Sequence, residues 1–335
     1  MKNQPQTVAF KPGERNIFFH ILTICNLRCR HCYINPEQHG DHLLLTLSEI
    51  ENWLRALRGD GPANVVFLGG EPTLHPDLPA AIRAAKKLNY AVTIDSNGYM
   101  LNHFLKRVHP QEVDFLSFSI DGPTPAVNDA IRGRDSFQVA TENLKKAVGL
   151  GFNVSVIYTA SRANIAHLPD MIPLLTDLKV KRFFIQVIGL RGKSAQAAHN
   201  DTLQVSREEW LAVVPYAAAK AAQAGIHVTY PKVFLEPEET FVCAGLVADN
   251  YFVFPNGRVY RCPLCEDHPI NSYHLAAGSL SPASGLREDA FFRLNIPEGC
   301  VMNKLLQPDT IEYDVSGQAL RRISCCLLKQ EIRPE

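Results

Sequence analysis

Hydrophobic and polar residues alternate along the chain in blocks that predict strands and helices in turn. Six apolar, β-forming runs are separated by segments in which apolar residues recur at helical spacing. The six runs are 16–23, 64–68, 91–95, 113–120, 153–158 and 182–188. Ser48 and Glu51 predict a capping box at the start of the first intervening helix. The βαβα order predicts a parallel sheet.

Near-continuous apolar strands are typical of a parallel sheet that is covered by helices. Six βα units predict an α/β fold, namely a partial (β/α)6 TIM-like barrel that is open on one side. A helix capped by Ser206 and Glu209 and a smaller cysteine-rich α+β region follow the barrel. We expect four parts: an N-terminal extension (1–15), the barrel (16–195), a helical connection (196–240) and a C-terminal domain (241–335).

Composition narrows the classes of partner. The chain has 335 residues, of which 46% are hydrophobic, and 34 Lys and Arg balance 34 Asp and Glu. Without a block of like charges, neither nucleic acid nor an anionic membrane is expected as a partner. No segment has the apolar length of a signal peptide core or a membrane span. We therefore expect a cytoplasmic protein.

Nine cysteines need a chemical reason. In a reducing cytosol, grouped cysteines indicate metal binding or catalysis more often than disulfides. Cys25, Cys29 and Cys32 form a Cx3Cx2C loop directly after the first predicted strand. Three thiolates suit a 4Fe-4S cluster in which one iron has no protein ligand. The alternatives are buried structural cysteines, or a zinc site with His31 or His20 as fourth ligand.

The cysteine loop, with His31 before its last cysteine, resembles the signature of radical S-adenosylmethionine (SAM) enzymes. The resemblance implies that SAM chelates the open iron and that His31 packs near the adenine. Gly69-Gly70-Glu71-Pro72, after the second predicted strand, resembles the family's GGEP motif, which holds the SAM amino group. Physically, a carboxylate and closely approaching backbone carbonyls suit an ammonium group.

Two later motifs extend this resemblance. Asp95-Ser96-Asn97-Gly98 is similar to the family's third-strand turn, which implies that Ser96 and Asn97 contact the ribose or methionyl part of SAM. A plain turn is the alternative. The segment from Ser119 to Gly133 is similar to one found in members with extended C-termini. It implies that Ser119 and Arg132 contact the SAM carboxylate, whereas Asp121 faces the substrate as a catalytic residue. A surface salt bridge would also explain Arg132.

The C-terminal cysteines carry a second signal. Cys243, Gly257 and Cys262 fit the CX9-15GX4C pattern that opens SPASM and twitch extensions. The sequence between these cysteines predicts a hairpin with an Asn-Gly turn, which would bring Cys243 and Cys262 together. Cys265 follows in a CxxC, and Cys300 or the Cys325-Cys326 pair would complete one auxiliary 4Fe-4S cluster. A zinc site, or two clusters with open positions, are the alternatives.

The resemblance implies reductive cleavage of SAM to a 5'-deoxyadenosyl radical, which abstracts hydrogen from a substrate, with a flavodoxin- or ferredoxin-type electron donor. An auxiliary cluster favours an oxidation or cross-link, and a peptide or protein is the first candidate substrate. About fifteen residues precede the first strand, so we expect a peptide to need a separate binding protein or the barrel itself. Alternatives are a small molecule or cofactor precursor, through alcohol dehydrogenation or tetrapyrrole side-chain chemistry, and a non-catalytic iron-sulfur or zinc redox protein.

Overall fold

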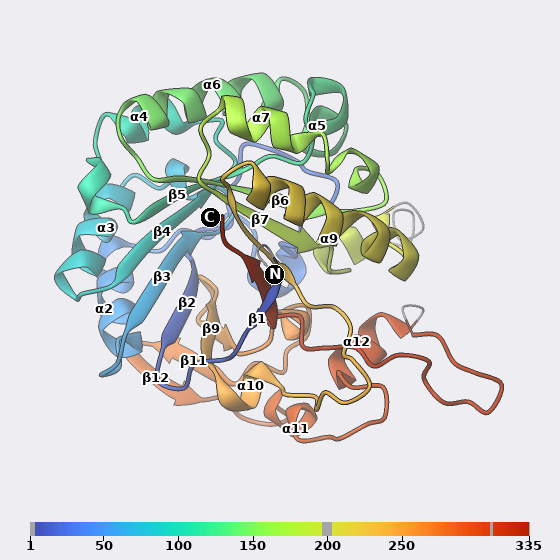
Figure 1. Cartoon of the computed structure of the whole chain (residues 1–335). Coiled ribbons are helices and arrows are strands. Elements are labelled where there is room, and N and C mark those ends of the chain that lie inside the picture. Colours follow the sequence, from blue (N-terminus) through green and yellow to red (C-terminus); the bar gives the residue numbers. More distant parts are fainter. Residues whose placement is uncertain (1–3, 196–202, 309–310, 335) are drawn as a thin grey trace.

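One sheet of 13 strands runs through the part of the chain that the computed structural model describes, which is residues 4–195, 203–308 and 311–334 (Figure 1). The strands lie in the order β1-β13-β8-β7-β6-β5-β4-β3-β2-β9-β10-β11-β12. Their bounds are β1 (Gln6–Val8), β2 (Arg15–His20), β3 (Ala63–Leu68), β4 (Ala91–Ser96), β5 (Phe115–Ser119), β6 (Val154–Ala160), β7 (Arg182–Val187), β8 (His227–Pro231), β9 (Asp249–Val253), β10 (Arg258–Tyr260), β11 (Tyr273–Ala276), β12 (Ser279–Pro282) and β13 (Lys329–Ile332).

Helices that alternate with the barrel strands cover the outer face of the curved sheet, and shorter helices belong to the C-terminal region (Figure 1). Their bounds are α1 (Pro36–His39), α2 (Leu47–Leu57), α3 (Leu78–Lys87), α4 (Leu101–Leu105), α5 (Pro125–Arg132), α6 (Ser136–Gly149), α7 (Met171–Asp177), α9 (Arg207–Gln223), α10 (Ala244–Val247), α11 (Asp289–Phe292) and α12 (Val301–Leu306). None of the described helices combines the length and the apolar character needed to cross a membrane.

The predicted partial barrel is confirmed. The six predicted strands are β2 to β7, each hydrogen-bonded in parallel to the next. The sequence analysis missed β8, which adds a further parallel strand beside β7. This five-residue strand lies in a segment interpreted as a helical connection, and its pairing with β7 and β13 depends on distant residues.

The C-terminal region continues the same sheet. Strand β9 pairs in parallel with β2, on the side away from β3, and β13 pairs with β8. The N-terminal strand β1 lies against β13, so the two ends of the chain meet there (Figure 1). The expected domain boundaries stay a prediction, and residues 196–202 at one of them lie outside the described part.

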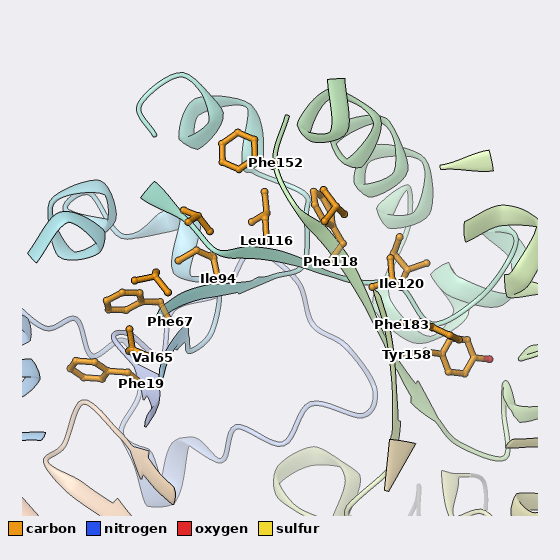
Figure 2. Close-up of a cluster of buried hydrophobic side chains, with 14 of the residues drawn as sticks. Phe19, Val65, Phe67, Ile94, Leu116, Phe118, Ile120, Phe152, Tyr158 and Phe183 are labelled. Atoms are coloured by element: carbon orange, nitrogen blue, oxygen red, sulfur yellow. The ribbon is translucent and has the colours of Figure 1, made fainter. Parts of the chain in front are cut away.

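Fully buried and less buried residues alternate along the barrel strands. Figure 2 shows the large side chains that pack between the sheet and its helices, including Phe19, Phe67, Ile94 and Phe118 from four consecutive barrel strands. These four side chains are fully buried. Their neighbours along each strand face the barrel interior and are often half-buried. The near-continuous apolar runs thus hide a two-faced pattern, in which one face forms the core and the other lines the barrel.

The capping box of α2 differs from the expected one. Thr46, not Ser48, is the N-cap: its side chain accepts a hydrogen bond from the Glu49 backbone, and the Glu49 carboxylate accepts one from the Thr46 backbone at 2.7 Å. The predicted pair, Ser48 and Glu51, was wrong by two residues. It has the same spacing as Thr46 and Glu49, and the helix begins before Ser48.

We predict that Thr46→Ala lowers the free energy of unfolding by about 1 kcal/mol, because one orphan helix N–H loses its acceptor. Ser48→Ala is the matched control, since Ser48 is also exposed and lies inside the helix. Denaturant titration of the two variants measures the difference. Equal effects for Thr46→Ala and Ser48→Ala would contradict the assignment of the cap.

Candidate functional site

The turn after β3 holds the loop after β2 through the backbone. Gly70 N donates to Leu22 O and Glu71 N donates to Ile24 O, both at 2.9 Å. A Cβ atom on Gly70 would lie 2.1 Å from Ile24 O, so only glycine allows this approach. The loop that carries Cys25 is therefore fixed against the Gly-Gly-Glu-Pro turn, whose Pro72 begins a one-turn helix.

Glu71 joins the ends of two strands. Its side chain is 1% exposed, and it accepts hydrogen bonds from Thr73 N at 3.1 Å, Ser96 Oγ at 2.8 Å and Asn97 N at 2.8 Å. Burial raises the pKa of Glu71 despite these bonds. The predicted Glu71, Ser96 and Asn97 are thus brought together by direct contacts.

The first two cysteines lie among polar neighbours. Leu27 N donates to Cys25 Sγ at 3.4 Å, Asn97 Nδ2 lies 3.8 Å from the same sulfur, and Cys29 Sγ lies 3.7 Å from Arg132 O. Burial raises the pKa of Cys25 to about 11 and also raises the pKa of Cys29. Such thiols keep their protons until a bound metal displaces them.

Asp121 ties the cysteine loop to the end of β5. The carboxylate is 0% exposed and contacts Arg132 Nε at 2.6 Å, His31 Nε2 at 3.0 Å and Thr159 N at 2.7 Å. Burial alone would raise the pKa of Asp121, but Arg132 and His31 lower it to about 2. These contacts give Asp121 a positioning role, and its expected catalytic, substrate-facing role stays a prediction.

His31 offers a test of whether a cofactor fits here. Its side chain is 8% exposed, and its Nδ1 has no hydrogen-bond partner among the described residues, while Nε2 is held by Asp121. An unpaired buried nitrogen in the same loop as three half-buried thiols fits a group bound at these cysteines. Ser119 is the last residue of β5 and is half-buried. Its expected contact with SAM stays a prediction.

The C-terminal cysteines gather around one apolar cavity. Five of them line it: Cys243, Cys262, Cys300, Cys325 and Cys326. Cys265 is buried and hydrogen-bonds with Cys262. The predicted hairpin is β9-β10, with Gly257 at a positive φ of 82°, and Cys243 and Cys262 on either side of it line the same cavity. The sequence left Cys325 and Cys326 open, and the fold brings both to the same cavity.

Two of these sulfurs lie at the starts of short helices. Cys243 is the N-cap residue of α10 and Cys300 is the N-cap residue of α12. The backbone N–H groups of Gly245 and Leu246 lower the pKa of Cys243, and those of Met302 and Asn303 lower the pKa of Cys300. Burial raises the pKa of Cys243 and of Cys300 to about 12. Backbone N–H groups aimed at sulfur stabilise negative charge, which suits a thiolate once a metal is bound.

No group of three or more His, Cys, Asp or Glu side chains in the described part of the chain is arranged to hold a metal ion. A structural zinc needs four such ligands about 2.0–2.3 Å from one ion. Both the zinc alternative and the iron-sulfur cluster therefore stay predictions at the two cysteine sites.

Residues 19–175 match the Radical SAM superfamily. The chain carries a radical SAM domain. This confirms the expected radical SAM domain. A radical SAM domain implies SAM and a 4Fe-4S cluster as cofactors. The domain begins within β2 and ends in α7, so it includes the cysteine loop, the Gly-Gly-Glu-Pro turn and Asp121.

Two relatives show how far the similarity extends. The radical SAM chain is 26% identical over 195 residues to Fe-coproporphyrin III synthase from Methanosarcina barkeri, which covers 57% of this chain but 49% of that protein. It is 26% identical over 271 residues to the probable GTP 3',8-cyclase of Saccharolobus solfataricus, covering 77% and 85%. The chain thus spans about half of the first relative and most of the second.

Solved structures support the fold. Streptococcus suis SuiB bound to SAM matches with a TM-score of 0.65 and 16% identity, over 80% of this chain and 63% of that chain. SuiB bound to its precursor peptide SuiA matches with a TM-score of 0.63 and 14% identity, over 89% and 65%. At these identities the likeness concerns the fold alone.

We predict that Gly70→Ala lowers the iron bound after anaerobic reconstitution severalfold, because the new methyl group displaces the cysteine loop from its turn. Gly149→Ala is the matched control, since a Cβ there meets nothing within 4 Å. Iron assay and circular dichroism of both variants give the comparison. Full iron binding by Gly70→Ala would contradict the proposed docking.

Asp95 generates a pH-dependent prediction. Burial raises the pKa of Asp95 to about 7, although a hydrogen bond with Ser117 opposes this. A carboxyl group whose pKa is higher in the folded state destabilises the fold when ionised, so stability should fall between about pH 4 and pH 7. Asp95→Asn should therefore raise the free energy of unfolding at pH 8 and change it little at pH 4. A similar change at both pH values would refute this.

Proposed function

We propose that the chain is a radical SAM enzyme that oxidises its substrate with the help of an auxiliary iron-sulfur cluster. The observation that carries the proposal is the cavity lined by five C-terminal cysteines, in a chain whose radical SAM domain carries its own cysteine loop. Two cysteine sites in one sheet supply more ligands than SAM cleavage requires. Oxidation of a substrate needs an electron acceptor, and a cluster at the second cysteine site would supply one.

Cys25, Cys29 and Cys32 would hold the first cluster. When the cluster and SAM are bound, their chemistry supplies a 5'-deoxyadenosyl radical that abstracts hydrogen from the substrate. The chain's own part is orientation. Asn97 is held between the Glu71 carboxylate and Asn26, at 2.8 and 2.9 Å, so the loop and the β4 turn keep one geometry. Rigid neighbours of this kind hold a reactive group in its productive position.

Asp121 would act on the first site through two neighbours. It pairs with His31, which lies between Cys29 and Cys32, and with Arg132, and its carboxylate is fully buried. Buried ion pairs that keep one arrangement orient the groups beside them. The family's expected contacts of Arg132 and Ser119 with the SAM carboxylate belong to this proposal.

Cys243, Cys262, Cys265 and Cys300 would hold the auxiliary cluster. Cys262 is the N-cap of the short helix Pro263–Cys265 and Cys265 is its last residue, and Cys243 and Cys300 line the same cavity as Cys262. Cys325 and Cys326 compete for the fourth place. Their adjacency allows one of them to serve as ligand while its neighbour packs against the apolar wall.

The substrate has two candidate classes. The first is the peptide or protein side chain expected from the resemblance to enzymes with SPASM or twitch extensions. The second is a small molecule or cofactor precursor, which the names of the sequence relatives favour, since these refer to a porphyrin and to GTP. Deuterium transfer into 5'-deoxyadenosine from labelled candidates of each class would discriminate between them.

The reconstituted protein should contain about eight irons per chain, as two four-iron clusters require, and Cys300→Ala should contain about four. Dithionite and SAM should yield 5'-deoxyadenosine with the native chain and none above background with Cys25→Ala. Iron assay, Mössbauer spectroscopy and chromatography measure these outcomes. Val301→Ala is the control, because Val301 lines the same cavity beside Cys300 without a sulfur.

Iron near four per native chain would overturn the auxiliary cluster. Absence of 5'-deoxyadenosine from a fully loaded native chain would overturn the enzyme and favour the non-catalytic redox protein.

A further inference from the structure

The loop after β7 touches both cysteine regions. Lys193 N donates to Cys32 O at 2.9 Å, which anchors the loop to the last cysteine of the first site. Gly192 N donates to Asp267 Oδ2 at 2.7 Å, two residues beyond Cys265. Consecutive residues of one loop therefore hold the ends of two cysteine segments that lie more than 200 residues apart in sequence.

Arg191 adds a side-chain link between the same regions. Its Nη1 donates to Pro263 O at 2.7 Å and pairs with Glu266, so it grips the backbone between Cys262 and Cys265 and the residue after it. The Arg191 side chain is 18% exposed and that of Glu266 is 2% exposed. A nearly buried guanidinium that is paired and hydrogen-bonded holds one geometry, because leaving either charge unpaired is costly.

The other face of Arg191 meets the first site. Its guanidinium lies over the ring of Tyr33, 4.8 Å from the centroid, and Tyr33 directly follows Cys32. Tyr33 is fixed in turn, because its hydroxyl lies 2.8 Å from His20 Nε2 and the opposite His20 nitrogen lies 2.9 Å from Val253 O. A carbonyl only accepts, so His20 Nδ1 carries the proton and Tyr33 donates to Nε2.

The loop after β7 approaches the cysteine loop closely. Gly192 has a φ of 54°, and a Cβ atom there would lie 2.5 Å from Tyr33 O and 2.9 Å from Cys32 O. The loop backbone thus packs directly on the cysteine loop. A displacement of the Cys262–Cys265 segment would be transmitted through Arg191 and Gly192 to Cys32.

We propose that Arg191 is a positioning residue that couples the two cysteine sites, so that a filled C-terminal site raises the affinity of the first site for SAM. The inference rests on the proposed function, in which the C-terminal cysteines hold a cluster. A cluster would fix the 262–265 segment, and Arg191 would carry that order to Cys32 and Tyr33. Coupling of this kind is reciprocal, and it typically changes affinity 5- to 150-fold.

A double-mutant cycle tests the coupling. The dissociation constant for SAM is measured on reconstituted native protein, Cys262→Ser, Arg191→Met and the double variant, from the change that SAM causes in the EPR spectrum of the first cluster. Cys262→Ser should raise this constant about 10-fold in the native background. In the Arg191→Met background it should raise the constant less than about twofold. The same fold-change in both backgrounds would overturn the proposal.

Two further variants keep the test sharp. Lys193→Met is the matched control, because only the Lys193 backbone takes part in the described contacts; it should leave the 10-fold effect of Cys262→Ser intact. If Arg191→Met loses iron from the first site, Arg191→Met with Glu266→Gln replaces it in the cycle, since this pair leaves no charge unpaired. A full 10-fold effect of Cys262→Ser in that background would also overturn the coupling.

The outcomes separate this inference from the proposed function. If the native protein binds only about four irons, the auxiliary cluster is ruled out. Cys262→Ser should then change SAM binding in neither background. If the native protein binds about eight irons but the effects in the cycle are additive, the auxiliary cluster is supported and only the coupling through Arg191 is ruled out.

Discussion

The two-sided pairing of β2 is the constraint on which the rest of the structure depends. Parallel hydrogen bonds join β2 to β3 on one side and to β9 on the other, with Phe18 in register with both Val66 and Phe252. The cysteine loop leaves the carboxyl end of β2, the Gly-Gly-Glu-Pro turn leaves β3, and the hairpin that leads to Cys262 begins with β9. Because carboxyl ends of parallel strands meet at one edge, one strand position brings three chemical segments together.

Close backbone approach and buried charge then fix these segments. Gly70 and Gly192 let two turns pack on the cysteine loop from different strands, where any larger residue would collide with a carbonyl oxygen. Asp121 and Glu71 are buried carboxylates whose oxygens are held by hydrogen bonds or ion pairs. Buried polar groups tolerate few alternative arrangements, so the site is rigid before any cofactor is considered.

The sequence predicted those parts that depend on local patterns. Apolar runs located the six strands of the barrel, and Asn256-Gly257 located the hairpin, since both signals lie within a few residues. Parts that depend on distant partners were missed or wrong. Strand β8 is recognised by its pairing, and the burial of Asp121 between His31 and Arg132 requires the fold. The start of α2 was misplaced for a local reason, because Thr46 with Glu49 and Ser48 with Glu51 have the same spacing. The bridge through Arg191 had no local signal.

The central proposal is that two iron-sulfur clusters bind to this chain, one at the cysteine loop after β2 and one at the C-terminal cysteines. The most direct measurement is anomalous diffraction at the iron edge from anaerobically grown crystals of the reconstituted protein. The account predicts two iron sites, one among Cys25, Cys29 and Cys32 and one in the cavity lined by Cys243, Cys262 and Cys300. Iron at the first position alone, with an ordered C-terminal cavity, would contradict it.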